Sequence, residues 1–314
     1  AKVQSGLVIV NTRRHARQLF ELMQCNGIEG AHHLTTAMSA AHRSYVLDKI
    51  RQDLKQKQPA RLVATSLIEA GVDISFQAVW RAWAGLDQIA QAAGRCNREG
   101  EFGPQGGYLT IFDPEPGEGR NPPYETRANA EVARSVCLQG KEVLSQEAIA
   151  EYFSELLWRK EDEKGFQALD CKKVGENGRW CGIMRAIEDT ADNLDFPFAD
   201  IAHAFRIIED TMVPVIIPKW IHPIAGIDSN IEERITAAAF RKKSGSKSGG
   251  IGGILRDLQR FVVQVPRPVR ANLLNASAAK AIAPDVFGDQ FIILQSKPLY
   301  SDKTGLHMDD PTYR

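Results

Sequence analysis

The sequence lacks several features that would place it in a familiar class. No apolar run among its 314 residues is long enough to cross a bilayer, and no charged-then-apolar signal segment opens the chain, so we expect neither a membrane span nor a membrane partner. An excess of positive charge is also missing, because Lys plus Arg and Asp plus Glu both number 39. The molecule as a whole therefore has no field that attracts nucleic acid, and any basic surface has to be local.

Disulfide and metal patterns are missing too. The five cysteines are scattered, odd in number and never spaced CxxC, which argues against a disulfide framework or a zinc site. The seven histidines have no metal-ligand spacing either, so we predict no metal site made by this chain alone. Scattered free cysteines favour a reducing compartment, and the expected location is the cytoplasm.

The first 115 residues instead contain a regular alternation of short apolar runs and helical segments. The predicted strands cover residues 7–10, 32–34, 61–64, 78–82 and 108–112. Each parallel strand pair needs a crossover, so this alternation predicts an α/β fold with a parallel sheet covered by helices on both faces. Ligands of such sheets bind at the carboxyl ends of the strands.

Hydroxyl and amide side chains follow the first three predicted strands. These pairs are Asn11–Thr12, Thr35–Thr36 and Thr65–Ser66. Such residues cap helices, and Ser66 with Glu69 has the spacing of a capping box. A helix start also presents unpaired N–H groups and the positive end of a dipole, which favour an anion. Capping and phosphate binding are compatible interpretations, and the sequence leaves both open.

The segment QAAGRCNREG carries an arginine pattern of helical spacing. Gln91, Arg95 and Arg98 lie at offsets of zero, four and seven, which would place them on one face of a helix. That face is either a solvated polar stripe or a phosphate-binding surface. Gly94 leaves the backbone beside Arg95 open to a close partner. Guanidinium groups bind phosphate oxygens in pairs and offset the charge that develops during phosphoryl transfer.

Several segments resemble motifs of superfamily two helicases. VATSLIEAGVD (63–73) resembles motif five, QAAGRCNR (91–98) fits the QxxGRxxR pattern of motif six, and VIVNT (8–12) is similar to motif four. The longer stretch SLIEAGVDISFQAVWRAWAGLDQIAQAAGRCNREG (66–100) resembles more specifically the CRISPR-associated helicase-nuclease family of type I interference systems. That resemblance implies a RecA-like fold for about the first 115 residues.

The resemblance also implies roles for the residues at matching positions. Arg95 and Arg98 would reach the ATP phosphates from the second of two lobes, with Gln91 bonding near the same site. Gly71 and Asp73 would couple the nucleotide state to the grip on DNA. The backbone of single-stranded DNA would be held by Asn11, Thr12, Thr36, Thr65 and Ser66.

The sequence contains no sign of the other half of a helicase site. A first RecA-like lobe supplies a phosphate loop and the acidic pair that holds Mg²⁺, yet GxxxxGK[ST], DEAD, DEAH and the His-Asp pair of the family's nuclease are all absent. We therefore interpret the chain as a segment that starts partway through a longer protein. We expect a second RecA-like lobe over residues 1–120, a helical connector over 121–200 and a small mixed α+β domain over 201–314. ATP and Mg²⁺ would bind only together with the first lobe, so the chain alone is expected to be inactive.

The third predicted domain contains a local basic segment. From Arg241 to Arg270 the sequence contains eight Lys or Arg and one acidic residue, Asp257. The segment is either a solvated loop or a contact to DNA phosphates.

The expected function is the motor half of an ATP-dependent single-stranded DNA translocase, which unwinds target DNA and, with a nuclease domain, degrades it. Its expected partners are single-stranded DNA, the first lobe and nuclease domain of the same protein, and a type I CRISPR surveillance complex. Two alternatives remain, namely the second lobe of a repair helicase and a noncatalytic module that docks on DNA or on another protein.

Overall fold

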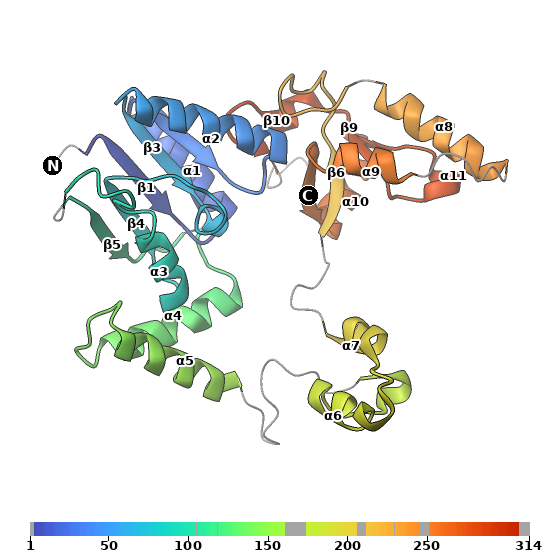
Figure 1. Cartoon of the computed structure of the whole chain (residues 1–314). Helices are drawn as coiled ribbons and strands as arrows, with labels where there is room; N and C mark the ends of the chain where they lie inside the picture. Colours follow the sequence, from blue (N-terminus) through green and yellow to red (C-terminus); the bar gives the residue numbers. More distant parts are fainter. Residues whose placement is uncertain are drawn as a thin grey trace. The chain divides into compact units, whose positions relative to one another are not determined.

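The structure is a computed structural model of the chain (Figure 1), and the fold is given for its described residues. These are residues 3–103, 106–117, 119–160, 174–205, 212–228, 230–244 and 251–307. The chain divides into two compact units, one of residues 1–127 with 211–314 and one of residues 128–210. Every helix in the described ranges is too short or too polar to span a bilayer.

Five parallel strands form the first sheet of the larger unit. They are β1 (Ser5–Ile9), β2 (Ala31–Leu34), β3 (Ala60–Ala64), β4 (Ala78–Ala82) and β5 (Tyr108–Phe112). Their order across the sheet is β2-β3-β1-β4-β5, and every neighbouring pair is parallel. All five strands predicted from the sequence are therefore confirmed, together with the crossovers that parallel pairing demands.

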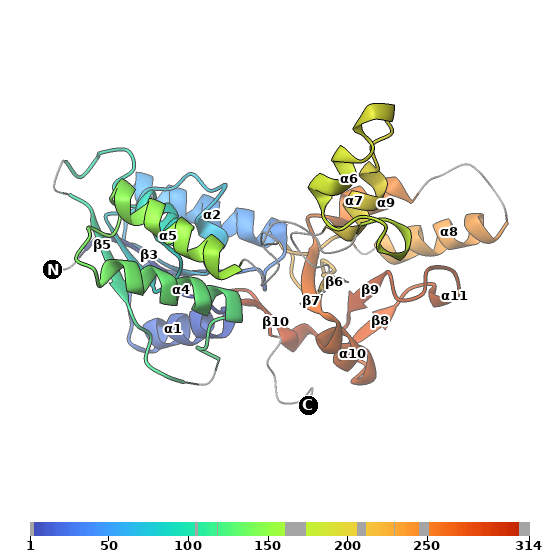
Figure 2. The ribbon, with the colours of Figure 1, turned by 90° about the horizontal axis from the view of Figure 1, so that it is seen from below.

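Helices cover both faces of this sheet, because successive strand side chains point to opposite faces. The helices are α1 (Arg13–Cys25), α2 (Ala40–Lys55) and α3 (Leu86–Ala93), with a short 3-10 turn at Ser66–Ile68. Val63 packs with Phe20 of α1, whereas the next residue back, Leu62, belongs to the cluster of Ile50 on α2. Figure 2 shows the sheet between α1 and α2. The arrangement is the predicted RecA-like α/β fold.

The smaller unit is helical. Its elements are α4 (Tyr124–Cys137), which leads into it, α5 (Gln146–Lys160), α6 (Ile183–Glu188), α7 (Phe198–Ala204) and 3-10 turns at Glu176–Gly178 and Ala191–Asn193. Trp180 is buried with Val174 and Ala186, and α6 and α7 pack against this cluster. Helices thus follow the first sheet as predicted, whereas the predicted domain boundaries stay a prediction.

The larger unit also contains a second, mixed sheet. Its strands are β6 (Met212–Ile216), β7 (Val262–Pro266), β8 (Ala279–Ala281) and β9 (Ile292–Leu294), in the order β7-β6-β9-β8. The helices of this part are α8 (Ile231–Lys243), α9 (Gly252–Leu258), α10 (Arg267–Asn275) and α11 (Pro284–Phe287), with a 3-10 turn at Lys297–Leu299. This confirms the predicted mixed α+β region. The run RANLLNASAAKAIA (270–283) has helical character by sequence, but its second half forms β8, which pairs antiparallel with β9.

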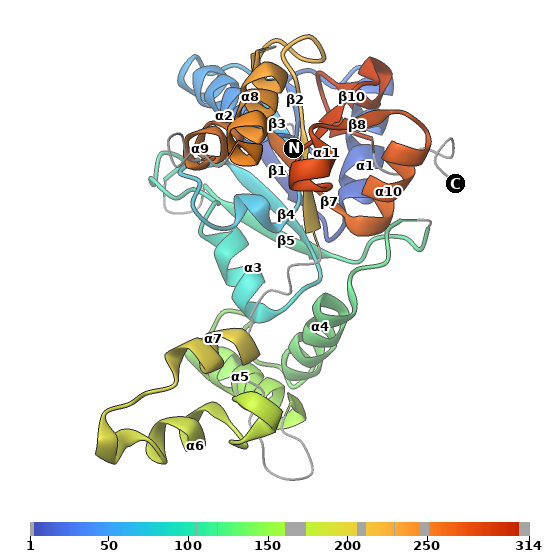
Figure 3. The same ribbon diagram turned by 90° about the vertical axis from the view of Figure 1, so that its right-hand side faces the viewer.

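Helices cover both faces of the second sheet as well. Val215 and Val265 share an apolar cluster with Leu273 of α10. Ile216 and Ile293 instead face α8 and α9 and pack in a separate cluster. Figure 3 shows α10 and α8 on opposite sides of β6 and β7.

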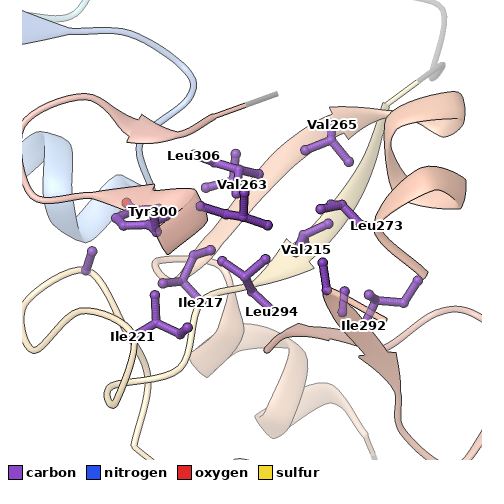
Figure 4. Packing of buried hydrophobic residues seen from close by; sticks show 14 of the residues in the cluster. Val215, Ile217, Ile221, Val263, Val265, Leu273, Ile292, Leu294, Tyr300 and Leu306 are labelled. Carbon is purple, nitrogen blue, oxygen red and sulfur yellow. The ribbon is translucent and has the colours of Figure 1, made fainter. Parts of the chain in front are cut away.

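A short hairpin connects the two sheets of the larger unit. Its strands, β10 (Tyr300–Ser301) and β11 (Gly305–Leu306), pair antiparallel. Tyr300 and Leu306 belong to the apolar cluster of the second sheet (Figure 4). The Leu306 N–H donates to the carbonyl of Ala37, just after β2, over 2.8 Å. Gly305 has φ +77°, and a Cβ there would lie 2.4 Å from that carbonyl oxygen, so the contact requires glycine.

A buried histidine network closes this junction. His42 Nε2 lies 3.1 Å from the carbonyl of Asp302, and its Nδ1 lies 3.0 Å from the Tyr300 hydroxyl. A carbonyl can only accept, so Nε2 carries the proton and Nδ1 accepts from Tyr300. The Tyr300 oxygen accepts in turn from the Ser39 N–H over 3.2 Å. Only the neutral ring satisfies this network. Burial, and secondarily the neighbouring His222, lowers the pKa of His42 to about 4.

Acid is expected to destabilise the larger unit through His42. The folded pKa lies below the usual 6.5, so the unfolded chain binds the extra proton and stability is lost as pH falls from about 6.5 toward 4. Between about pH 7 and pH 5 the loss should be about 2 kcal/mol, measured by urea unfolding. His42→Gln should reduce this pH dependence. His203→Gln, which removes an exposed histidine, should not, and equal slopes in the two variants would contradict the assignment.

Candidate functional site

Five polar residues predicted to hold DNA meet around one cavity. The cavity has a volume of about 510 Å³ and lies where β1, β2 and β3 end. The predicted residues that line it are Asn11, Thr12, Thr36, Thr65 and Ser66. Parallel strands end at the same edge of a sheet, so residues far apart in sequence converge there. Thr36 and Ser66 are exposed to solvent at this edge, and Thr65 is buried.

Two of these residues are held by the surrounding chain. Thr12 caps α1, since its hydroxyl accepts from the His15 N–H over 3.1 Å and donates to the carbonyl of Gly119. The Asn11 amide donates to the carbonyl of Trp83 over 2.8 Å, while its oxygen accepts from Arg81 over 2.6 Å. These contacts fix the polar edge in position. A capped helix start with hydroxyl groups beside it can bind phosphate oxygens without reading bases.

The arginine segment does not form the helical face that its spacing predicts. Helix α3 ends at Ala93, so Gln91 lies on its last turn while Arg95 and Arg98 lie beyond it. The chain after the helix runs parallel to residues 75–76 instead. The Phe76 N–H donates to the carbonyl of Arg95 over 2.9 Å, and the Asn97 N–H donates back to Phe76 over 2.8 Å. The helical-face prediction is therefore wrong, because backbone pairing sets the positions of both arginines.

Both guanidinium groups bind the loop that follows β3. Arg95 donates from Nε to the carbonyl of Ile68 over 3.1 Å and from Nη2 to that of Glu69 over 2.6 Å. Arg98 Nη1 lies 2.5 Å from Asp73 Oδ1, and its side chain is 43% exposed. Partial burial lowers the pKa of Arg95, and the charge of Arg98 lowers it further. Carboxylates accompany these two positive charges, because Asp73 and Glu99 both lie within ion-pair distance of Arg98.

The remaining residues predicted for the nucleotide site lie in the same region. Gly71 has φ +71°, and a Cβ there would meet nothing within 4 Å. Glycine is thus required at this position for its backbone conformation rather than for a contact within the described chain. Asp73 and Gln91 are both exposed. Of the predicted set, the structure brings Asp73 against Arg98 and places Arg95 against the loop that leads to Gly71.

A buried arginine that the sequence analysis missed connects the two sets of residues. Arg81 of β4 is 1% exposed. Its Nε lies 2.7 Å from Glu69 Oε1, and its Nη1 donates to Asn11 Oδ1 over 2.6 Å and to the carbonyl of Ala82 over 2.9 Å. The same Glu69 accepts from Arg95 through its backbone carbonyl. Arg81 therefore links the polar edge to the arginine segment.

The capping box predicted for Ser66 and Glu69 is wrong. The turn after β3 spans only Ser66–Ile68 and has no side-chain cap, and the Glu69 carboxylate binds Arg81 instead. Burial raises the pKa of Glu69 to about 7, while the Arg81 charge acts in the opposite direction. A buried carboxylate depends on the cation that its oxygen contacts.

The described residues contain no group of three or more His, Cys, Asp or Glu that could hold a metal ion. The segment 245–250, within the basic stretch from Arg241 to Arg270, lies outside the described residues, as do Cys171 and the last seven residues.

Comparisons with known proteins find similar sequences over part of the chain. Residues 2–101 match the family described as CRISPR-associated nuclease/helicase Cas3, C-terminal. The chain is 44% identical over 70 residues to a CRISPR-associated nuclease/helicase Cas3 of Haloferax volcanii, covering 22% of the chain and 8% of that protein. It is 29% identical over 142 residues to a CRISPR-associated helicase Cas3 of Thermoproteus tenax, covering 45% of the chain and 24% of that protein.

Solved structures extend the similarity of fold. The crystal structure of T. fusca Cas3-ATP matches 97% of the chain and 38% of its own length, with a TM-score of 0.56 and 14% identity. A chain in a CRISPR RNA-guided surveillance complex, pre-nicking, matches 97% of the chain and 41% of its own length, with a TM-score of 0.51 and 14% identity. The chain thus spans well under half of these relatives. By sequence, residues 2–101 match the C-terminal region of the CRISPR-associated nuclease/helicase Cas3 family, and by fold nearly the whole chain is similar to Cas3 structures. Both findings support the interpretation of the chain as the C-terminal half of a Cas3 helicase.

Proposed function

We propose that the chain supplies the second motor lobe of an ATP-dependent single-stranded DNA translocase that acts in type I CRISPR interference. The observation that carries this proposal is the convergence of Asn11, Thr12, Thr36, Thr65 and Ser66 on one cavity at the carboxyl edge of the sheet. Their hydroxyl and amide groups suit a phosphate backbone, which carries no base identity, so we expect DNA binding with little sequence preference.

In this proposal the arginine segment binds ATP from the second lobe. A guanidinium has more N–H donors than the two that Arg95 directs to the loop, so this side chain can hold the loop and face a phosphate together. Arg98 is paired with Asp73 and exchanges that carboxylate for the nucleotide when the first lobe closes. Gln91 forms a hydrogen bond near the same nucleotide site. Nucleotide binding is supported by the related Cas3 structure solved with ATP.

Mg²⁺ neutralises phosphate charge when it is bound. None of the described residues forms a cluster that could hold it, so its ligands belong to the first lobe in this proposal. The roles left to this chain are to place two cations and to hold the DNA strand.

Gly71 and Asp73 carry the coupling between these two tasks. The loop from Ile68 to Asp73 binds Arg95 and Arg98 on one side, and its Glu69 carboxylate binds Arg81 on the other. Arg81 also holds Asn11 at the DNA edge. A shift of the loop when nucleotide binds therefore acts on Asn11 through one buried side chain, which makes Arg81 a positioning residue.

The proposal is tested by adding a separately supplied first RecA-like lobe to the 314-residue chain. We expect the mixture to hydrolyse ATP and single-stranded DNA to stimulate the rate. A mixture that stays inactive with and without DNA would instead favour a docking module. Recovery of a type I surveillance complex with the chain would separate CRISPR interference from DNA repair.

A charge reversal at the polar edge should weaken DNA binding. Ser66→Glu places a carboxylate on the cavity, and like-charge repulsion from DNA phosphates should raise the Kd for an oligodeoxythymidine by about tenfold. The matched control is Ser44→Glu, which makes the same exchange at an exposed position of α2. Fluorescence anisotropy measures both. Equal affinities in the two variants would remove this edge from the DNA path.

A further inference from the structure

Three arginines occupy the start of helix α1. Arg13, Arg14 and Arg17 lie in its first turns, and no acidic residue accompanies them in the first turn. The amino end of a helix is the positive end of its dipole, so cations there are unfavourable. One of the three, Arg17, has a partner on the helix, because its Nε lies 3.8 Å from Glu21 Oε1. The dipole gives no reason for three cations at this end, whereas binding an anion does.

The three arginines line a cavity next to the polar edge. Its volume is about 200 Å³, compared with about 30 Å³ for a water molecule in the liquid. Thr12, Thr35 and Thr304 also line it, and no Asp or Glu is among its described lining residues. Several guanidinium groups gathered on one cavity are the chemistry that binds phosphate.

A buried histidine completes the lining. The side chain of His33, on β2, is 2% exposed, and neither ring nitrogen has a hydrogen-bond partner among the described residues. Buried polar atoms are nearly always paired in proteins. The His33 ring packs at 5.6 Å from the ring of Phe20 on one side and lines the cavity with Arg17. A ligand oxygen in the cavity would supply the missing partner.

We propose that this arginine cavity, lined by Arg13, Arg14, Arg17, His33 and Thr304, binds a phosphate group. Thr12 and Arg13 line both this cavity and the DNA-edge cavity, so the two are neighbours. Because the two cavities adjoin, the ligand that we assign to the arginine cavity is a phosphodiester group of the DNA strand that binds the neighbouring cavity. This assignment rests on the proposed function. The cavity extends the DNA path from the first sheet to the β10–β11 hairpin, because Thr304 comes from that hairpin.

The test measures binding of the 314-residue chain to labelled oligodeoxythymidine of about 15 nucleotides over a series of salt concentrations. Arg14→Gln and Arg17→Gln should each weaken binding by about tenfold and lower the slope of log K against log salt by about 0.7. Arg51→Gln is the matched control, because it removes the same charge from an exposed position of α2 outside this cavity. If both cavity variants bind as the control does, the DNA assignment is overturned.

The role of His33 has its own readouts. His33→Phe keeps a ring against Phe20 and removes both nitrogens, so it should leave the fold intact and weaken binding about fivefold. In the wild type, the NMR resonance of the His33 ring should shift and saturate as oligodeoxythymidine or inorganic pyrophosphate is added. No shift with either probe would overturn the phosphate cavity.

The two probes separate the sources of phosphate and the two proposals. A response to pyrophosphate without a response to DNA would support a phosphate cavity and overturn its place on the DNA path. Loss of affinity in Ser66→Glu with full affinity in Arg14→Gln and Arg17→Gln would leave the proposed function standing and remove the cavity from it. DNA that binds nowhere on the chain would instead count against the proposed function.

Discussion

Replacing Arg95 by alanine should reduce the ATPase rate of the chain combined with a first RecA-like lobe by about three to five powers of ten. A guanidinium placed against the transferred phosphate offsets charge that develops only in the transition state, so the loss should appear in kcat. Arg95 is suited to this task because its contacts to Ile68 and Glu69 hold the side chain before nucleotide arrives. Steady-state hydrolysis with saturating single-stranded DNA measures the effect.

Two further variants separate this role from a general loss of charge. Arg95→Lys keeps the charge but cannot bind in the forked geometry, so most of the activity should still be lost. Arg159→Ala is the control for Arg98→Ala, because both side chains are 43% exposed and both form ion pairs with carboxylates. Only Arg98→Ala should lower the rate. If Arg95→Ala hydrolyses ATP at the wild-type rate, the arginine segment has no part in the nucleotide site.

The strands could be predicted because their signal is local. Each is an apolar run bounded by polar turn residues, and burial on both faces of a parallel sheet requires that pattern. Parallel pairing then places the carboxyl ends of the strands together. The convergence of Thr36 and Ser66 on one cavity therefore follows from the strand topology alone. The polar residues at the carboxyl edge of the sheet could thus be predicted from the sequence.

The arginine segment was harder to predict because its position depends on a distant partner. Spacing alone favours a helix through Arg98, but the chain leaves α3 at Ala93 and pairs with Phe76. Asn97 adopts φ +47° in this turn, a conformation that helices exclude. Pairing between segments about twenty residues apart is set by the packed fold, which local periodicity does not report.

Arg81 is unusual in the sequence because it is a charged residue within a predicted strand, but the sequence does not identify the residue that pairs with it. A charged residue in the middle of the apolar run AVWRA requires a counter-charge, because a buried ion is expensive unless it is paired. The partner, Glu69, already had a plausible local role as a capping residue. Sequence analysis could therefore have flagged Arg81 without finding the bond that matters.

Removing the buried cation should be strongly destabilising. Arg81→Met fills similar volume but leaves the Glu69 carboxylate buried without its partner, and should lower the free energy of unfolding by about 3–5 kcal/mol. Urea unfolding measures this loss. The matched control is Arg51→Met, which breaks an exposed pair with Asp48 and should change stability by less than about 1 kcal/mol.

The pH dependence of the variant identifies Glu69 as the cause. Burial raises the pKa of Glu69 and Arg81 lowers it, so without Arg81 the folded pKa lies still higher above the unfolded value. The folded chain then holds the extra proton, and stability present at low pH is lost as pH rises through the folded pKa. Arg81→Met should therefore be less stable at about pH 8 than at about pH 6.

Adding Glu69→Leu to Arg81→Met should restore most of the stability and remove this pH dependence, because an apolar pair replaces a buried ion pair at little cost. DNA-stimulated ATPase should not return in the double variant, since Asn11 still lacks the side chain that positions it. Recovery of both stability and stimulation would show that Arg81 serves the fold alone.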